Sequence, residues 1–112
     1  MSRIFHLVRP EVWEKSLEKG KHTVPSLQSE GFIHCSSYEQ VLGSANKHYP
    51  DGEELLVLVI PEKWVKNILK WEESRGGALF PHLYGPLPVE KVETLRILQR
   101  GENREWNWVK EY

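Results

Sequence analysis

The chain has 112 residues, of which 39% are hydrophobic and five are tryptophan, which is enough for one domain over residues 1–112 with a single core. Its formal net charge of −1 gives no basic excess, so a small ligand is a better candidate for its partner than a nucleic acid. Cys35 is the only cysteine, which excludes an intrachain disulfide and a cysteine-based zinc cluster.

The N-terminal sequence lacks the long apolar region of a secretory signal peptide. No apolar run in the chain reaches the length that is needed to cross a membrane. We therefore expect a soluble cytoplasmic protein that does not enter the membrane, and we leave its oligomeric state open.

The first elements are predicted from periodicity and from helix-end signals. Residues 3–8 predict a strand, in which alternation places one polar side chain, His6, on a face with apolar neighbours. Pro10 suits the first turn of a helix and Gly20 suits its C-terminal cap. The side chains expected to face inward from this helix are Val12, Trp13, Ser16 and Leu17. Residues 21–29 have weak periodicity and predict an irregular link with room for one helical turn.

Residues 30–37 combine a strand-like run with polar side chains, and the rest of the chain is organised around them. Ile33 and Cys35 fall on an apolar face, which predicts that Cys35 is a small core residue. Ser37 is placed to cap a following helix, and Gln40 completes a capping box. Alternation puts three side chains on the opposite face of this strand: Phe32, His34 and Ser36. A polar pair between a strand end and a helix start is a common way to build a ligand site.

The second half of the chain predicts more strands than helices. Residues 55–60 are continuously apolar, which predicts a central strand buried on both faces. Pro61 begins a short helix. Residues 74–88, with two adjacent glycines and three prolines, predict the longest irregular segment, and such segments are often functional loops. Further strands are expected at residues 69–73, 89–98 and 105–109, the last at a sheet edge.

Three histidines occur in similar surroundings, with polar groups on one side of an extended segment and apolar groups on the other: His6, His34 and His82. This repetition favours a shared cleft lined by His6, His34, Ser36, His82 and Tyr84. The alternative is that each histidine lies at the edge of the core and bonds to the backbone. A zinc site of three histidines is a further alternative, but no pair has local ligand spacing, so we expect no metal.

Charged residues before the irregular segment allow two interpretations. Glu72, Glu73 and Arg75 form a charge run that is most simply a solvated surface. Arg75 is also a candidate phosphate ligand if the following loop folds over a nucleotide.

In several motifs and in their order the chain resembles domain-of-unknown-function family 952. The resemblance lies in residues 4–7, the helix that contains Trp13, and residues 25–27, 30–36 and 80–87. It implies a fold similar to that of ADP-ribosyltransferases. This is an α+β single domain in which a curved, split, mixed β-sheet and two to three short helices surround a cleft for a nicotinamide dinucleotide.

The resemblance also implies roles for individual residues. His6 matches the histidine that bonds the adenosine ribose in poly-ADP-ribose polymerases, and Ser36 is expected to hold ribose hydroxyls beside it. His34 takes the place of the tyrosine that stacks on nicotinamide. His82 or Tyr84 is expected to assist acid–base chemistry or orientation. The chain departs from the pattern at the third motif, because no glutamate stands at the position that stabilises the transition state.

Three functions follow in order of preference. The first is a nucleotide-binding domain that takes NAD or an ADP-ribose nucleotide, with NAD as cofactor and with ADP-ribosyl transfer or NAD cleavage as its chemistry. The second is a small-ligand binding or interaction module without catalysis, which the missing glutamate favours. The third is a histidine-based, metal-dependent hydrolase.

Overall fold

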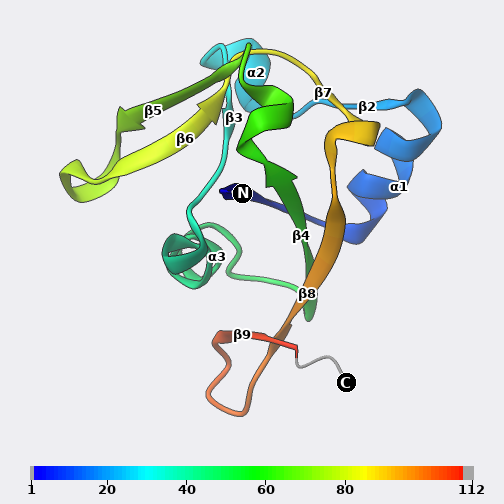
Figure 1. The fold of residues 1–112 in the computed structure, drawn as a ribbon. Helices are drawn as coiled ribbons and strands as arrows, with labels where there is room; N and C mark the ends of the chain where they lie inside the picture. Colours follow the sequence, from blue (N-terminus) through cyan, green and yellow to red (C-terminus); the bar gives the residue numbers. More distant parts are fainter. Residues whose placement is uncertain (1, 110–112) are drawn as a thin grey trace.

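A sheet of four strands crosses the middle of the fold, and the computed structural model describes residues 2–109 apart from the side chain of Arg75. In spatial order the strands are β1 (Arg3–Val8), β4 (Glu54–Pro61), β8 (Thr94–Arg100) and β9 (Trp106–Trp108). β4 is the continuous apolar run, and it lies between β1 and β8 as its composition predicts (Figure 1). β9 is the predicted edge strand and pairs only with β8.

The remaining strands form two smaller sheets. The larger has the order β3 (Ile33–His34), β6 (Leu79–Leu83) and β5 (Leu69–Glu73), and β2 (Lys21–His22) pairs with β7 (Leu87–Pro88). Every pairing within residues 2–109 is antiparallel, so the predicted mixed sheet is wrong. The consecutive strands β5–β6 and β8–β9 pair as hairpins, and β1–β4 and β4–β8 pair antiparallel across longer connections that contain other elements.

One isolated bridge joins the four-stranded sheet to the segment that follows β3. The amide N–H of Phe5 donates to the carbonyl of Ser36 at 2.8 Å, and the amide of Ser36 donates back to the carbonyl of Phe5 at 2.7 Å. Beyond this bridge the two sheets separate. The β-structure is therefore split at Phe5 and Ser36.

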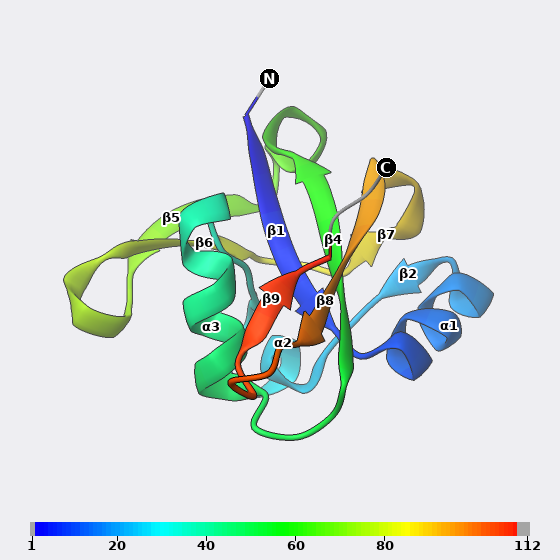
Figure 2. The same ribbon diagram turned by 90° about the horizontal axis from the view of Figure 1, so that it is seen from below.

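Helices cover both faces of the four-stranded sheet. α1 (Pro10–Lys19) packs Trp13 on the face that contains Ile4 and Leu58, together with apolar side chains from β3 and β6. α3 (Val41–His48) packs on the opposite face, where Trp106 of β9 completes the core. Figure 2 shows α1 and α3 on the two sides of the sheet. α2 (Pro25–Ser29) is the single helical turn allowed for in the 21–29 link.

Local signals at helix ends behave as predicted. Ser37 and Gln40 form a capping box at the start of a 3-10 turn over Tyr38–Gln40, which leads directly into α3. Gly20 closes α1 in the left-handed conformation, with φ of 79°. The other 3-10 turns cover Glu62–Val65, Arg75–Gly77 and Val89–Lys91.

Three predictions need correction. Residues 74–88 are not one irregular loop, because residues 79–83 form β6 in the middle of its sheet, and the flanking glycines and prolines hide its short period. The strand predicted at residues 89–98 runs over 94–100, because the residues after Pro88 form a 3-10 turn. Val12 and Leu17 are 39% and 53% exposed, so the buried stripe of α1 is narrower than predicted.

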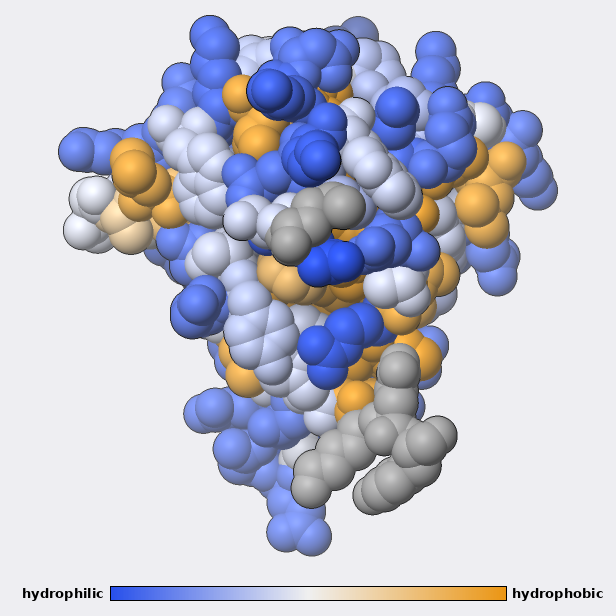
Figure 3. Space-filling view, in the orientation of Figure 1, coloured by the Kyte–Doolittle hydropathy of each residue, from blue (hydrophilic) through white to orange (hydrophobic). Residues whose placement is uncertain are grey.

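Hydrophilic side chains dominate the face shown in Figure 3, and apolar side chains are visible between them near the centre of the view. Within residues 2–109 no helix is long and apolar enough to cross a membrane.

Candidate functional site

A cleft of about 560 Å³ opens beside the C-terminal end of β1, close to the bridge between the sheets. It is bounded by α2, the segment around β3, α3 and the β5–β6 hairpin, and its lining includes His6, Arg9, Glu30, His34, Ser36, Ser44, Tyr49 and Phe80. Three of the predicted site residues, His6, His34 and Ser36, therefore meet there. His82 and Tyr84 are not among the lining residues, and the side chain of Arg75 lies outside the described part of the chain.

His6 has both ring nitrogens engaged inside the protein. Its Nδ1 lies 2.7 Å from the carbonyl oxygen of His34, which can only accept, so Nδ1 carries the proton. Its Nε2 lies 3.1 Å from Nε2 of His22. Burial, followed by repulsion from His22, lowers the pKa of His6 to about 3. His6 is consequently neutral near pH 7, and its Nε2 accepts the hydrogen bond from His22.

His22 extends this chain of hydrogen bonds to α1. Its side chain is fully buried, and its Nδ1 lies 2.7 Å from the hydroxyl oxygen of Ser16. Because Nε2 of His22 has to donate to His6, Nδ1 accepts, and the Ser16 hydroxyl directs its proton to this nitrogen rather than to the carbonyl of Val12 at 3.2 Å. Burial lowers the pKa of His22 to about 4, so the ring is neutral and its proton lies on Nε2, facing His6. We call Ser16, His22 and His6 the buried relay. Sequence reasoning missed His22 because β2 has only two residues, too few to show a period.

The two members of the predicted polar pair, His34 and Ser36, lie in different environments. Ser36 is buried, and its hydroxyl lies 3.1 Å from the hydroxyl of Ser44 on α3, at the wall of the cleft. Cys35, next to it, is a buried core residue as predicted, and burial raises the pKa of its thiol. Ser36 and Ser44 thus form the hydroxyl-bearing part of the cleft.

His34 connects the cleft to a second group of side chains. Its side chain is half exposed, and its Nε2 lies 2.9 Å from a carboxylate oxygen of Glu30. Its ring packs edge-on against Phe32 and His82, with centroids 4.8 and 5.4 Å away. Of the common face predicted for Phe32, His34 and Ser36, the contact between Phe32 and His34 is confirmed, whereas the Ser36 hydroxyl meets Ser44 on α3.

His82 lies in a group with Phe32, Glu72 and Tyr84, which we call the His82 cluster. Phe32 stacks on His82 with ring centroids 4.0 Å apart. Nδ1 of His82 donates to Glu72 Oε1 at 2.8 Å, and the Tyr84 hydroxyl donates to the same oxygen at 2.5 Å. The bonds from Tyr84 and then His82 hold the pKa of Glu72 below its usual value, and the bond to Glu72 raises the pKa of Tyr84.

The side chain of Glu72 is 39% exposed and Glu73 is exposed, as predicted for a solvated charge run, but Glu72 also accepts hydrogen bonds from His82 and Tyr84. β5 and β6 pair so that residue 72 lies opposite residue 80, a register that no local pattern reveals. Nε2 of His82 is buried and has no hydrogen-bond partner among the described residues.

One family model matches most of the chain. The family described as "Protein of unknown function (DUF952)" matches residues 7–95. The chain belongs to the DUF952 family. A comparison with curated proteins gives no match.

Solved structures of CC0527 from Caulobacter crescentus are similar to this DUF952 protein over nearly its whole length. One crystal structure has a TM-score of 0.87 and 31% sequence identity, over 95% of this chain and 94% of that one. A solution NMR structure of CC0527 has a TM-score of 0.81 and 32% identity, over 94% and 91% of the two chains. The family predicted from the motifs is therefore confirmed, and the α+β fold with a curved antiparallel sheet is shared with CC0527.

The arrangement limits which side chains of the DUF952 protein can exchange protons near neutral pH. The histidines of the buried relay are neutral and fully bonded, so they are suited to holding structure. His82 donates through Nδ1 to a carboxylate and leaves Nε2 as an acceptor, which is how a histidine is prepared to act as a base. Its ring is separated from the cleft by His34.

A three-histidine metal site does not form. His6 belongs to the buried relay and His82 to the His82 cluster, so the predicted histidines face different partners. Among the residues that the structure describes, no group of three or more His, Cys, Asp or Glu side chains has the geometry to hold a metal ion.

Proposed function

We propose that this DUF952 protein binds a nucleotide of the NAD or ADP-ribose type in the cleft. The observation that carries the proposal is the position of the cleft at the split between the two sheets, with His6, His34 and Ser36 in its lining. The resemblance to ADP-ribosyltransferases implies a dinucleotide site at such a split. The volume of about 560 Å³ also falls in the usual range for small-molecule sites.

We propose a role for each of the following cleft residues from its contacts. Ser36 and Ser44 present hydroxyls to the ligand, as expected for groups that bond a ribose. His6 does not have a ring nitrogen to spare, so its role is to form the wall and to fix the backbone of His34. Phe80 and the ring of His34 supply the flat surfaces on which a base or a nicotinamide ring packs.

For catalysis we propose cleavage or transfer at the nicotinamide ribose, with His34, His82 and Tyr84 as the candidate residues. In hydrolysis, water would replace nicotinamide at the ribose carbon, and a base would take the proton of that water. Nε2 of His82 is a candidate for this base because its other nitrogen is already bonded to Glu72. The ligand would have to reach it past His34.

The second candidate is a binding module without turnover, and one observation favours it. The two carboxylates closest to the predicted histidines, Glu30 and Glu72, already accept hydrogen bonds from protein side chains. Neither is left to stabilise positive charge on a reacting ribose. In this case the cleft would hold the nucleotide as a sensor or carrier does.

The decisive experiment is an amide NMR titration with NAD, ADP-ribose and a 2′-phosphorylated nucleotide. We expect shifts at His6, His34, Ser36 and Phe80 with at least one of them. His34→Ala should abolish these shifts, and Lys47→Ala, an exposed change on α3 away from the cleft lining, should leave them intact. No shift at millimolar ligand would overturn the proposal. Incubation with NAD then separates the candidates, because only an enzyme releases free nicotinamide.

A further inference from the structure

Arg9 lies at the end of β1, where the chain enters α1, and lines the cleft beside Tyr49. It is the only lysine or arginine among the described residues that line the cleft. A guanidinium remains charged at every physiological pH and carries five N–H donors in a planar fork. Arg9 was not singled out by any sequence motif.

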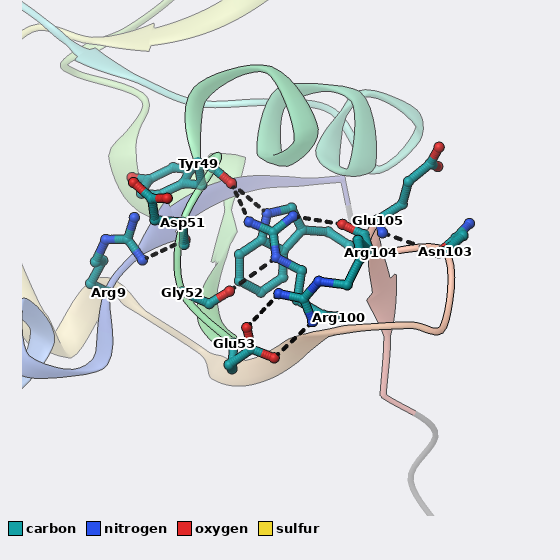
Figure 4. Close-up of polar contacts among 10 residues, drawn as sticks. Arg9, Tyr49, Asp51, Gly52, Glu53, Arg100, Asn103, Arg104 and Glu105 are labelled. Atoms are coloured by element: carbon teal, nitrogen blue, oxygen red, sulfur yellow. Dashed lines mark hydrogen bonds and ion pairs between the residues drawn. The ribbon is translucent and has the colours of Figure 1, made fainter.

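The position of Arg9 is fixed by its surroundings rather than by an ion pair. Its Cζ lies 5.0 Å from the centroid of the Tyr49 ring, and its Nη1 donates to the carbonyl of Asp51 at 3.1 Å (Figure 4). Gly52 has φ of 95°, and a Cβ added there would collide with Nη1 of Arg9. The turn at residues 50–52 is therefore shaped to receive this guanidinium.

Arg100 holds the same turn from the other side and gives a contrast. Its Nε donates to the carbonyl of Gly52 at 2.9 Å and its Nη2 to that of Tyr49 at 2.8 Å, and Nη1 donates to Arg104. Figure 4 shows Arg9 and Arg100 approaching the turn from opposite sides. All three guanidinium nitrogens of Arg100 thus donate to backbone carbonyls. Arg9 donates through one nitrogen, and among the described residues it has no carboxylate partner within ion-pair distance.

We infer that Arg9 is the phosphate-binding residue of the cleft and takes the pyrophosphate of the nucleotide through the unused edge of its guanidinium. This inference rests on the proposed function and adds the anionic part of the ligand to it. A guanidinium that is already oriented loses little freedom on binding, and its fork matches two phosphate oxygens. The bound nucleotide would then extend from Arg9 and Tyr49 to the hydroxyls of Ser36 and Ser44.

The test compares ligands with and without phosphate in two variants. Arg9→Gln removes the charge at the cleft, and Arg104→Gln removes one charge at an exposed ion pair with Glu53, so that net charge is matched. Calorimetry or NMR measures the dissociation constants of ADP-ribose, adenosine and inorganic pyrophosphate. We expect Arg9→Gln to weaken ADP-ribose about 10- to 100-fold and to abolish pyrophosphate binding, with adenosine changed less than about twofold. Arg104→Gln should match the unmodified protein.

Each other result has a definite meaning. Equal affinity of ADP-ribose for the Arg9→Gln and Arg104→Gln variants would overturn the assignment of Arg9 and leave the proposed function standing. Binding of pyrophosphate through Arg9 without binding of any nucleotide would overturn the proposed function and keep the anion site. If the unmodified protein binds none of the three ligands, both the assignment of Arg9 and the proposed function are overturned.

Discussion

The buried relay and the His82 cluster are linked by one residue, His34, whose carbonyl accepts from His6 and whose ring packs against His82. The histidines of the two groups have different hydrogen-bond partners. In the relay two imidazoles bond to each other and to uncharged groups, and burial keeps both neutral. In the His82 cluster the imidazole donates to a carboxylate, and its other nitrogen is buried without a hydrogen-bond partner among the described residues.

This difference gives the relay histidines a structural role. A histidine with a pKa of about 3 or 4 is a neutral imidazole near pH 7, without the second proton that an imidazolium acid gives up, so the relay cannot supply acid catalysis there. The hydrogen bonds of the buried relay give each of its buried polar side chains a partner, and the bond from His6 holds the backbone of His34 in place. Four predictions test this difference between the buried relay and the His82 cluster, in order from the largest expected effect on stability to the smallest.

Replacing His22 by leucine should lower the free energy of unfolding more than any other change proposed here. His22→Leu keeps the volume but removes the donor to His6 Nε2, which is then buried without a partner. We expect the free energy of unfolding to fall by about 3 kcal/mol, measured by urea denaturation. Lys21→Gln, an exposed neighbour on β2, should change it by less than about 0.5 kcal/mol. A loss below about 1 kcal/mol for His22→Leu would mean that the relay contributes little.

The second prediction concerns pH. The folded pKa values of His6 and His22 lie below the ordinary value near 6.5, so the unfolded chain binds more protons as pH falls. Neither histidine lowers stability well above pH 6.5. The penalty grows below that pH and levels off near pH 4 for His22 and pH 3 for His6.

Each histidine should cost about 1.4 kcal/mol between pH 7.5 and 5.5, or roughly 2.7 kcal/mol together. Denaturation curves at both pH values measure this loss. In His22→Leu the loss should be about half as large, since one of the two groups is gone. An unchanged stability over this range would show that the relay histidines take up protons as readily in the folded protein as in the unfolded chain, which would contradict their lowered pKa values.

The third prediction places His34 outside the core. Its side chain is half exposed, so His34→Ala should change the free energy of unfolding by less than about 1 kcal/mol, even where it abolishes nucleotide binding. The same urea denaturation measures it. A loss above about 2 kcal/mol would make His34 a structural residue and remove the reason to assign it to the site.

The smallest effect on stability is expected in the His82 cluster, and its readout is a titration. Glu72→Gln keeps an acceptor for the Tyr84 hydroxyl but removes the negative charge, so the pKa of Tyr84 should fall toward its ordinary value. Carbon-13 NMR of the tyrosine rings follows Tyr84 separately from the others. A pKa of Tyr84 that does not move would contradict the hydrogen bond to Glu72.

Several features follow from short-range patterns alone. The alternation in residues 3–8 places His6 on the face of Ile4, the apolar run at 55–60 predicts β4, and Ser37 with Gln40 predicts the cap before α3. These succeed because each depends on side chains within a few residues, where backbone geometry sets direction. The family motifs are likewise contiguous, and they led to the DUF952 assignment.

The partners of the site residues depend on contacts across the chain. His6 meets His22 because α1 returns the chain to a two-residue strand, and Glu72 meets His82 and Tyr84 through the register of β5 on β6. Arg9 meets the turn at Gly52 only after β1 and β4 have paired. Local patterns determine which way a side chain points along its own strand or helix. Pairing between distant segments determines which partners that side chain contacts. These contacts and the burial that comes with them make the two histidines of the buried relay neutral near pH 7.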